Sequence, residues 1–156
     1  MVIDNFFIRC KIPSQYIYWG ENYVDIFRKS DPEKAFKKIR TFDDVSLAKV
    51  TAEDLRDMAR ELLTVETGII LNSGPFIFNF FEFEKFPFWE GQGRELVEWR
   101  LKKVFPENLE EYEHDFFRLN KKRILSILLK RNLKEKIETL TRECGISLTY
   151  LGNSTV

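Results

Sequence analysis

The sequence is poor in the residues from which metal and redox sites are usually built. It has one histidine, His114, and two cysteines, Cys10 and Cys144, which are far apart and show no CxxC spacing. A single histidine without a second one or a cysteine pair does not supply the ligands of a typical zinc site. Two isolated thiols fit a reducing cytoplasm. The composition therefore predicts no metal centre.

Motifs for phosphate binding and for acyl transfer are also missing, since there is no GxxxxGK[ST], GxGxxG or GxSxG pattern. The acidic run places Glu111, Glu113 and Asp115 on one face of an expected strand. General acid chemistry needs a buried carboxyl with a raised pKa, and we interpret this run as a solvated edge. We expect no catalytic residue, no cofactor and no enzymatic activity.

Charge and hydropathy argue against two further classes. Lys and Arg together number 25, as do Asp and Glu, and this zero net charge gives no reason to expect a nucleic-acid partner. No apolar run approaches the roughly 20 residues of a membrane helix, and residues 1–14 lack the pattern of a signal peptide. We expect membrane association only indirectly, or through a segment outside this chain.

What the sequence does have is apolar mass: 44% hydrophobic residues, including fifteen Phe, which is enough for a packed core. Residues 15–19 and 23–29 flank the turn Gly20-Glu21-Asn22 and predict a hairpin. Residues 33–42 fit a strand or a short helix equally well. Thr51, with Asp54 three residues later, predicts a capped helix whose apolar stripe is Leu55, Met58, Ala59, Leu62 and Leu63. Thr67-Gly68 ends this segment, and residues 69–71 are expected to form a buried strand.

The second half predicts strands at residues 76–83, 112–119, 124–129 and 146–151. One helix follows Gly91 and Gly93, and another begins after a cap at Asn132 and ends at Cys144-Gly145. This β-α-β-β-α-β order is the ferredoxin-like pattern. Because Asn72-Ser73-Gly74-Pro75 is a strong break, we predict one subdomain over residues 1–74 and a second over residues 75–156.

Two features could serve a partner. Residues 76–89 contain seven Phe and a Trp, and a strand that is apolar on both faces must be covered on both. The core covers one face, and the other face is covered either at a seam between subdomains or by a partner that binds in a groove. Residues 118–136 hold eight Lys or Arg and one acid, which fits a solvated face, an acidic partner or anionic lipid headgroups.

The run IYWGENYVDIF, from Ile17, resembles the opening hairpin of actin-like proteins. The segments FIFNFFEFEKFPF, RELVEWRLKKVFP and the helix that ends in Cys-Gly-Ile resemble one branch of that superfamily. This branch holds the type II secretion system protein L and the type IV pilus assembly protein M. The resemblance spans about residues 15–156. It implies an α/β (α+β) fold: a degenerate actin-like, ribonuclease H-like first subdomain with an inserted ferredoxin-like one, and a strand at residues 33–42.

The departures from that pattern concern the nucleotide loop. Gly20 is kept, but Tyr18 stands where actin-like proteins use an Asp for the nucleotide's metal ion, and Glu21 and Asn22 replace small residues. The second nucleotide-binding lobe would follow Val156. The resemblance therefore implies a loop that has lost its nucleotide.

By resemblance, we expect a non-catalytic scaffold of a type II secretion or type IV pilus assembly platform, at the cytoplasmic face of the bacterial inner membrane. It would dock the assembly ATPase or a membrane partner. The candidate interface residues are Phe86, Phe88, Trp89, Arg123, Lys130 and Arg131. One alternative is a ferredoxin-like regulatory domain that binds a small molecule in a Phe-lined pocket. Another is an active actin-like ATPase, against which Tyr18 counts.

Overall fold

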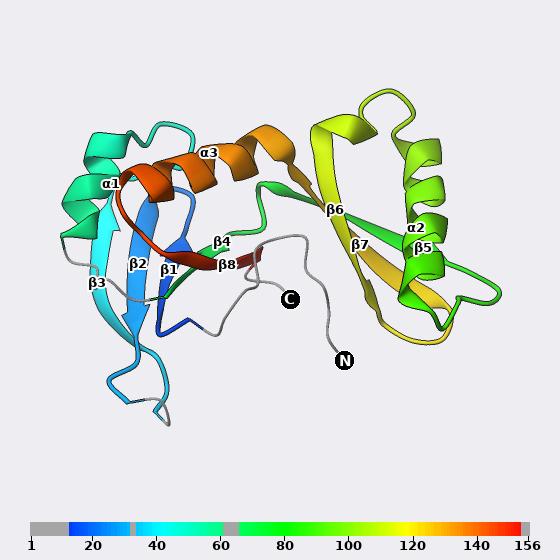
Figure 1. The fold of residues 1–156 in the computed structure, drawn as a ribbon, viewed down its shortest axis with the longest axis horizontal. Coiled ribbons are helices and arrows are strands. Elements are labelled where there is room, and N and C mark those ends of the chain that lie inside the picture. The colour runs from blue at the N-terminus through cyan, green and yellow to red at the C-terminus, as the bar shows by residue number, and fades with distance from the viewer. Residues whose placement is uncertain (1–12, 32–33, 61–65, 154–156) are drawn as a thin grey trace. The chain divides into compact units, whose positions relative to one another are not determined.

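The computed structural model describes residues 13–31, 34–60 and 66–153 (Figure 1). Within them the chain divides into two compact units. The five-stranded unit comprises the described residues up to 75 together with 135–153, and the three-stranded unit comprises residues 76–134. No helix in the described ranges is both long and apolar enough to cross a membrane.

The five-stranded unit is built on one mixed sheet with the strand order β3-β2-β1-β4-β8. β1 pairs antiparallel with β2 and parallel with β4, and β4 pairs parallel with β8. The strands are β1 (Gln15–Trp19), β2 (Tyr23–Arg28), β3 (Lys37–Asp43), β4 (Thr67–Leu71) and β8 (Leu148–Asn153). Ile17, Ile69 and Leu151 are adjacent in register and at most 2% exposed, so they form a continuous apolar row across the parallel strands.

Two helices of this unit have well-defined ends. α1 (Ala52–Ala59) begins with the predicted capping box, in which Thr51 and Asp54 each accept a hydrogen bond from the other's backbone. α3 (Arg131–Glu143) ends in a Schellman motif: Ile146 N–H donates to Thr141 O, and Gly145 N–H donates to Arg142 O. Gly145 has a φ of 71°, which a residue with a Cβ adopts only at a cost. The two helices meet where Cys144 Sγ contacts Ala52 O.

The three-stranded unit packs one helix on an antiparallel sheet of order β5-β7-β6. Its elements are β5 (Phe76–Glu82), α2 (Glu90–Val104), a 3₁₀ turn (Leu109–Glu111), β6 (Tyr112–Arg118) and β7 (Arg123–Lys130). Val97 and Leu101 of α2 are fully buried in one cluster with Ile124 and Leu128 of β7. Ile77 and Phe81 of β5 pack against the same cluster. Alternate residues of β5 therefore face the helix, as the period of two predicts.

The structure corrects the predicted subdomain boundary at its second end. The last strand of the expected ferredoxin-like order, β8, pairs with β4 in the five-stranded sheet. Residues 135–153 consequently belong to the five-stranded unit, and the insertion is β5-α2-β6-β7. β8 joins there because Leu151, Gly152 and Asn153 are buried as the outer parallel strand.

The structure also tests several predictions about single elements and helix ends. The uncertain segment 33–42 contains a strand, β3, as the resemblance implied, whereas Thr67-Gly68 open β4 instead of ending a helix. Asn132 is the second residue of α3 and so is not its cap. Gly91 and Gly93 lie inside the first turn of α2. The predicted stripe positions Leu62 and Leu63 lie outside the described residues.

Candidate functional site

The β1–β2 turn is where the sequence predicted a degenerate nucleotide loop. Gly20 N–H donates to Tyr23 O at 2.9 Å and closes the hairpin. The rings of Tyr18 and Tyr23 lie 6.0 Å apart, and a Cβ on Gly20 would come within 2.4 Å of the Tyr23 ring. A side chain at this position would displace the Tyr23 ring, because that ring covers the glycine. The turn glycine is thus covered by an aromatic ring, and its amide is already bonded.

The electrostatics of this turn favour the neutral form of the Tyr23 phenol. Desolvation raises the pKa of Tyr23. Tyr18 raises it further, through charge and a side-chain hydrogen bond, and the charge of Asp25 adds to this effect. Glu21, on the turn itself, is exposed and adds a negative charge. A neutral phenol is a poor ligand for a hard metal ion.

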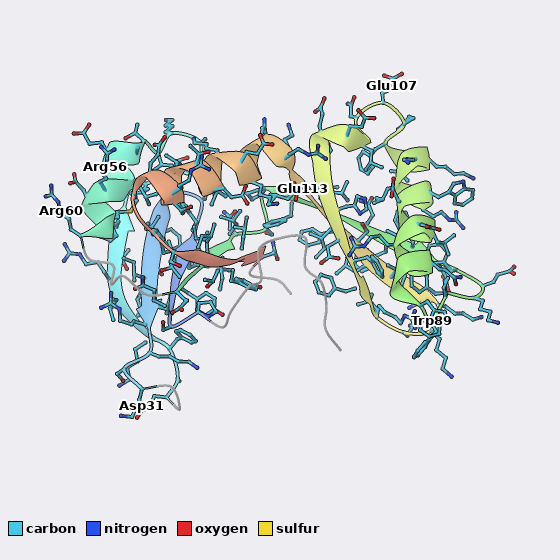
Figure 2. All side chains as sticks on the ribbon, in the orientation of Figure 1. Asp31, Arg56, Arg60, Trp89, Glu107 and Glu113 are labelled. Carbon is cyan, nitrogen blue, oxygen red and sulfur yellow. The ribbon has the colours of Figure 1, made fainter. Side chains whose placement is uncertain are left out.

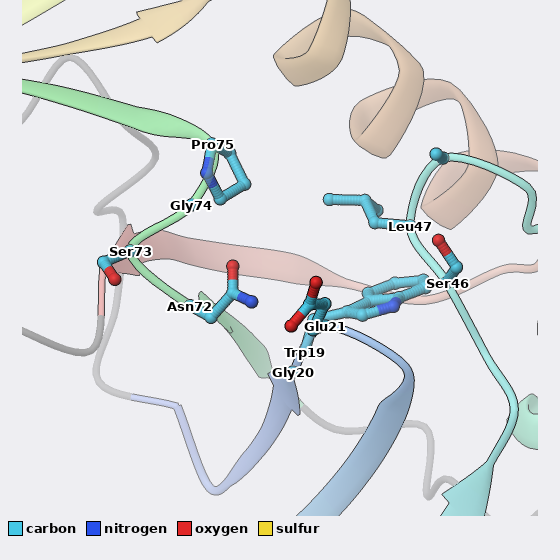
Figure 3. Close-up of a pocket in the computed structure, with 10 residues that line it drawn as sticks. Trp19, Gly20, Glu21, Ser46, Leu47, Asn72, Ser73, Gly74 and Pro75 are labelled. Carbon is cyan, nitrogen blue, oxygen red and sulfur yellow. The ribbon is translucent and has the colours of Figure 1, made fainter.

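A pocket of about 440 Å³ opens beside this turn (Figure 3). Three segments of the five-stranded unit line it: the β1–β2 turn, the loop before α1 and the connection after β4. The lining residues are Trp19, Gly20, Glu21, Ser46, Leu47, Ala48, Asn72, Ser73, Gly74 and Pro75. Trp19 and Leu71 end two neighbouring parallel strands, so the pocket lies at the carboxyl edge of the sheet, where α/β folds commonly bind ligands.

One lining residue of this pocket, Trp19, has a buried hydrogen-bond donor without a partner among the described residues. Trp19 is 2% exposed, and its indole Nε1 has no hydrogen-bond partner within the described part of the chain. Figure 3 shows the indole lying between Glu21 and Ser46, with its nitrogen on the side of Ser46. Buried indole N–H groups usually find a partner.

A side chain of α3 donates hydrogen bonds to the segment 46–48, which lines one side of the pocket. Lys136 Nζ donates to the carbonyl oxygens of Leu47 and Ala48, each at 3.0 Å. The Lys136 ammonium group is therefore already bonded to backbone carbonyls, and no Lys or Arg lines the pocket itself. The pocket therefore offers N–H and O–H donors and one carboxylate, which suits a neutral or cationic group better than a phosphate.

Two carboxylates of the acidic run, Glu113 and Asp115, form ion pairs in the structure. Glu113 pairs with Lys134 at 2.9 Å. Asp115 is 1% exposed and lies 3.7 Å from Arg94, so the expectation of a solvated edge is wrong for this residue. Burial lowers the pKa of His114, an effect that Glu98 opposes. No cluster of three His, Cys, Asp or Glu side chains that could hold a metal occurs among the residues described.

The structure separates the six predicted interface residues into three groups. Phe86 is buried in the core, with its ring 5.3 Å from Phe83, and so it is no surface anchor. Phe88 and Trp89 protrude, and Figure 2 shows Trp89 at the end of the three-stranded unit. Arg123 opens β7 near that end.

The remaining two predicted interface residues, Lys130 and Arg131, are exposed at the opposite end of β7. The eight residues of this strand, Arg123–Lys130, span about 24 Å at the usual rise. A single small contact patch does not include both ends.

The strand order, with its antiparallel hairpin, parallel β4 and β8 and an inserted unit, defines an actin-like α/β domain, as predicted. Among solved structures, the cytoplasmic domain of EpsL, an inner membrane component of the type II secretion system of Vibrio cholerae, is similar with a TM-score of 0.69. It is 11% identical, over 91% of this chain and 57% of that one. A chain of the PilM–PilN type IV pilus biogenesis complex has a TM-score of 0.72 and 13% identity. The match covers 94% of this chain and 48% of that one.

These two likenesses establish the fold, which is the one that the sequence resemblance implied. The chain spans about half the length of the two solved structures. No protein-family model and no curated protein matches the sequence.

Sequence reasoning identified the turn with Gly20 and Glu21 but missed the pocket beside it. Asn72 to Pro75 were read only as a chain break, and Trp19 and Ser46 were not singled out. The available signal was positional: Trp19 and Asn72 both follow strands that the actin-like order makes parallel neighbours.

Proposed function

We propose that this chain is a non-catalytic scaffold domain of a type II secretion or type IV pilus assembly platform. The observation that carries the proposal is the β1–β2 turn. It has the position of a nucleotide loop in an actin-like fold, but the ring of Tyr23, which lies 6.0 Å from that of Tyr18, covers its glycine. A domain that keeps the strand order of the fold, but whose ligand loop is covered by a side chain, is suited to binding partner proteins.

The loop chemistry supports the absence of ATP binding. An actin-like loop needs an anionic ligand for the metal ion and free amides for phosphate. Here a phenol replaces the carboxylate, the Gly20 amide is bonded to Tyr23 O, and Glu21 would repel phosphate. We infer that the domain acts by fixing a partner's position at the cytoplasmic face of the inner membrane.

For the protein contact we propose Lys130 and Arg131, at the end of β7 where α3 begins. Both are exposed, and neighbouring cations favour an acidic segment through complementary charge. The assembly ATPase, or an inner-membrane platform protein, would supply that segment.

Co-purification with the cognate assembly ATPase and platform proteins tests the proposal. Wild-type chain should bind at least one of them at tens of micromolar or tighter, and the double variant K130E/R131E should bind at least tenfold more weakly. K102E/K103E makes the same charge change at two exposed positions of α2 and should bind normally. Absence of binding to either class of partner would reject the scaffold role. Mg-ATP binding by calorimetry would reject the non-catalytic reading.

A second candidate function is supported by the unpartnered Trp19 indole. We infer that the pocket beside the turn could make the scaffold responsive to a small neutral or cationic ligand with a hydrogen-bond acceptor. Such a ligand should raise the melting temperature in proportion to its saturation, and Trp19→Phe, which removes the indole N–H together with the five-membered ring, should abolish the shift. Stabilisation by phosphate-bearing nucleotides alone would contradict this ligand class.

A further inference from the structure

Two neighbouring aromatic side chains protrude from the loop between β5 and α2. Phe88 is 85% exposed and Trp89 is 72% exposed, and their rings meet edge to face with centroids 6.2 Å apart. Leaving two large apolar side chains in water forgoes the stabilisation that burial would give. We call residues 82–89, which carry these two rings, together with the β6–β7 turn at residues 118–123, the aromatic tip.

The loop that carries the two rings is fixed to the unit below it. Phe86, two residues before Phe88, is 7% exposed and anchors the loop in the core. The Arg118 guanidinium lies 4.9 Å from the Phe86 ring centroid and donates to Pro87 O. Phe83 N–H donates to Lys122 O at 2.9 Å, which joins the loop to the hairpin turn. The protruding pair is therefore presented by a braced loop.

The aromatic tip is also basic, although the chain as a whole has no net charge. Residues 82–89 and 118–123 contain five cations and two carboxylates. Glu82 is already 3.9 Å from Arg123. All five cations are exposed: Lys85, Arg118, Lys121, Lys122 and Arg123. Protruding Phe and Trp side chains are thus surrounded by lysine and arginine.

We propose that the aromatic tip binds the surface of membranes that contain anionic lipids. Trp and other amphipathic aromatics favour the boundary between headgroups and acyl chains, and basic side chains contact the headgroup phosphates. Phe88 and Trp89 enter that boundary while the hairpin cations stay at the headgroups. The protein thereby has a membrane contact of its own in the three-stranded unit.

The composition of the tip favours a membrane over a protein partner. Three of its five cations are lysines, and lysine is depleted in protein–protein interfaces, whereas arginine is enriched there. At a lipid surface a mobile point charge is sufficient to contact headgroup phosphates, so lysine serves there as well as arginine does. The tip also lies at the opposite end of β7 from Lys130 and Arg131, so both contacts can be occupied. The inference does not rest on the proposed scaffold role.

Vesicle sedimentation tests this inference with purified chain alone. Binding is expected to phosphatidylcholine vesicles that contain about 30 mol % phosphatidylglycerol, to be much weaker to pure phosphatidylcholine, and to fall as salt rises. F88S/W89S should lose binding to the level of pure phosphatidylcholine. K121Q/K122Q should weaken it by about thirty-fold, from about 1 kcal/mol per cation.

Trp99 supplies the matched control on the same unit. It is 50% exposed and has Lys103 Nζ 3.6 Å from its ring centroid, but it lies midway along α2. W99S should bind vesicles like the wild type. In a W99F background, Trp89 emission should shift to the blue on binding, while Trp19, which is 2% exposed, contributes a constant signal.

The outcomes separate the alternatives. No binding to anionic vesicles at low salt, or equal binding to neutral ones, overturns the inference. An equal loss in W99S and F88S/W89S shows general stickiness and overturns it as well. If F88S/W89S leaves vesicle binding intact but abolishes co-purification with a platform protein, the tip is a protein contact instead.

Discussion

The two units of the chain use their aromatic side chains in opposite ways. In the five-stranded unit, the Tyr23 ring, a neighbour of Tyr18, lies over the glycine of the β1–β2 turn. In the three-stranded unit, Phe88 and Trp89 point into solvent on a braced loop. One set of rings closes a site, and the other set creates an exposed surface.

This difference shows how a few side chains give two loops opposite surface character. The Tyr23 ring changes the surroundings of the β1–β2 turn glycine without altering the strand order. Exposing two rings and a basic hairpin on the inserted unit adds a surface that the parent sheet does not need. Fold alone does not determine function, so the proposed sites are argued from these side chains and not from the strand order.

Phe86 and Phe88 offer the sharpest test of this contrast because they are two residues apart. Phe86→Ala should lower the free energy of unfolding by about 3–5 kcal/mol, since it removes a buried ring, whereas Phe88→Ala should change it by less than about 0.5 kcal/mol. Urea denaturation followed by circular dichroism measures both. Similar losses for the two variants would mean that the loop does not divide core from surface as described.

The closed turn predicts the next largest effect. Gly20→Ala places a methyl group 2.4 Å from the Tyr23 ring, and overpacking of this kind costs about 1–3 kcal/mol. In a Tyr23→Ala background the same glycine substitution should cost much less. A double-mutant cycle of unfolding free energies gives the coupling between the two positions. Additive losses would show that the ring does not cover the glycine in solution.

Elements defined by local pattern could be predicted from the sequence. The hairpin of residues 15–19 and 23–28, the Thr51 capping box and the β6–β7 hairpin all follow from alternation or from residues a few positions apart. The partner of β8 could not be predicted in this way. Thr67 pairs with Leu148, and periodicity does not indicate which of two sheets a strand so distant in sequence joins.

Only part of the candidate site could be predicted from the sequence, for a similar reason. The turn glycine and its altered neighbours lie in one short run, which pattern comparison reveals. The pocket is assembled from three segments, so Trp19 and Ser46 become neighbours only in the folded chain. Phe86 was predicted as an interface residue beside Phe88 because the run FPFW gives no local sign of which ring turns inward.

Two glycines near helix ends should respond to alanine in opposite directions. Gly145→Ala forces a Cβ into a positive φ of 71° and should cost about 1 kcal/mol. Gly91, in the first turn of α2, has no atom within 4 Å of an added Cβ, so Gly91→Ala should stabilise by up to about 1 kcal/mol. Thermal unfolding of the two variants compares the units directly. Stabilisation by Gly145→Ala would contradict the Schellman end of α3.

The smallest expected effect concerns acid. The Thr51 hydroxyl and backbone N–H both donate to Asp54, and these hydrogen bonds lower the pKa of that carboxyl. A lowered pKa in the folded state means that the stabilisation is complete above the unfolded value of about 4 and is lost as the pH falls through the folded value. Thr51→Ala should move the Asp54 pKa, followed by carboxyl NMR titration, back toward its usual range and weaken the acid dependence of stability. Thr51→Ser keeps the hydroxyl and should behave like the wild type; an unchanged pKa in Thr51→Ala would show that the capping box does not hold the five-stranded unit's first helix in solution.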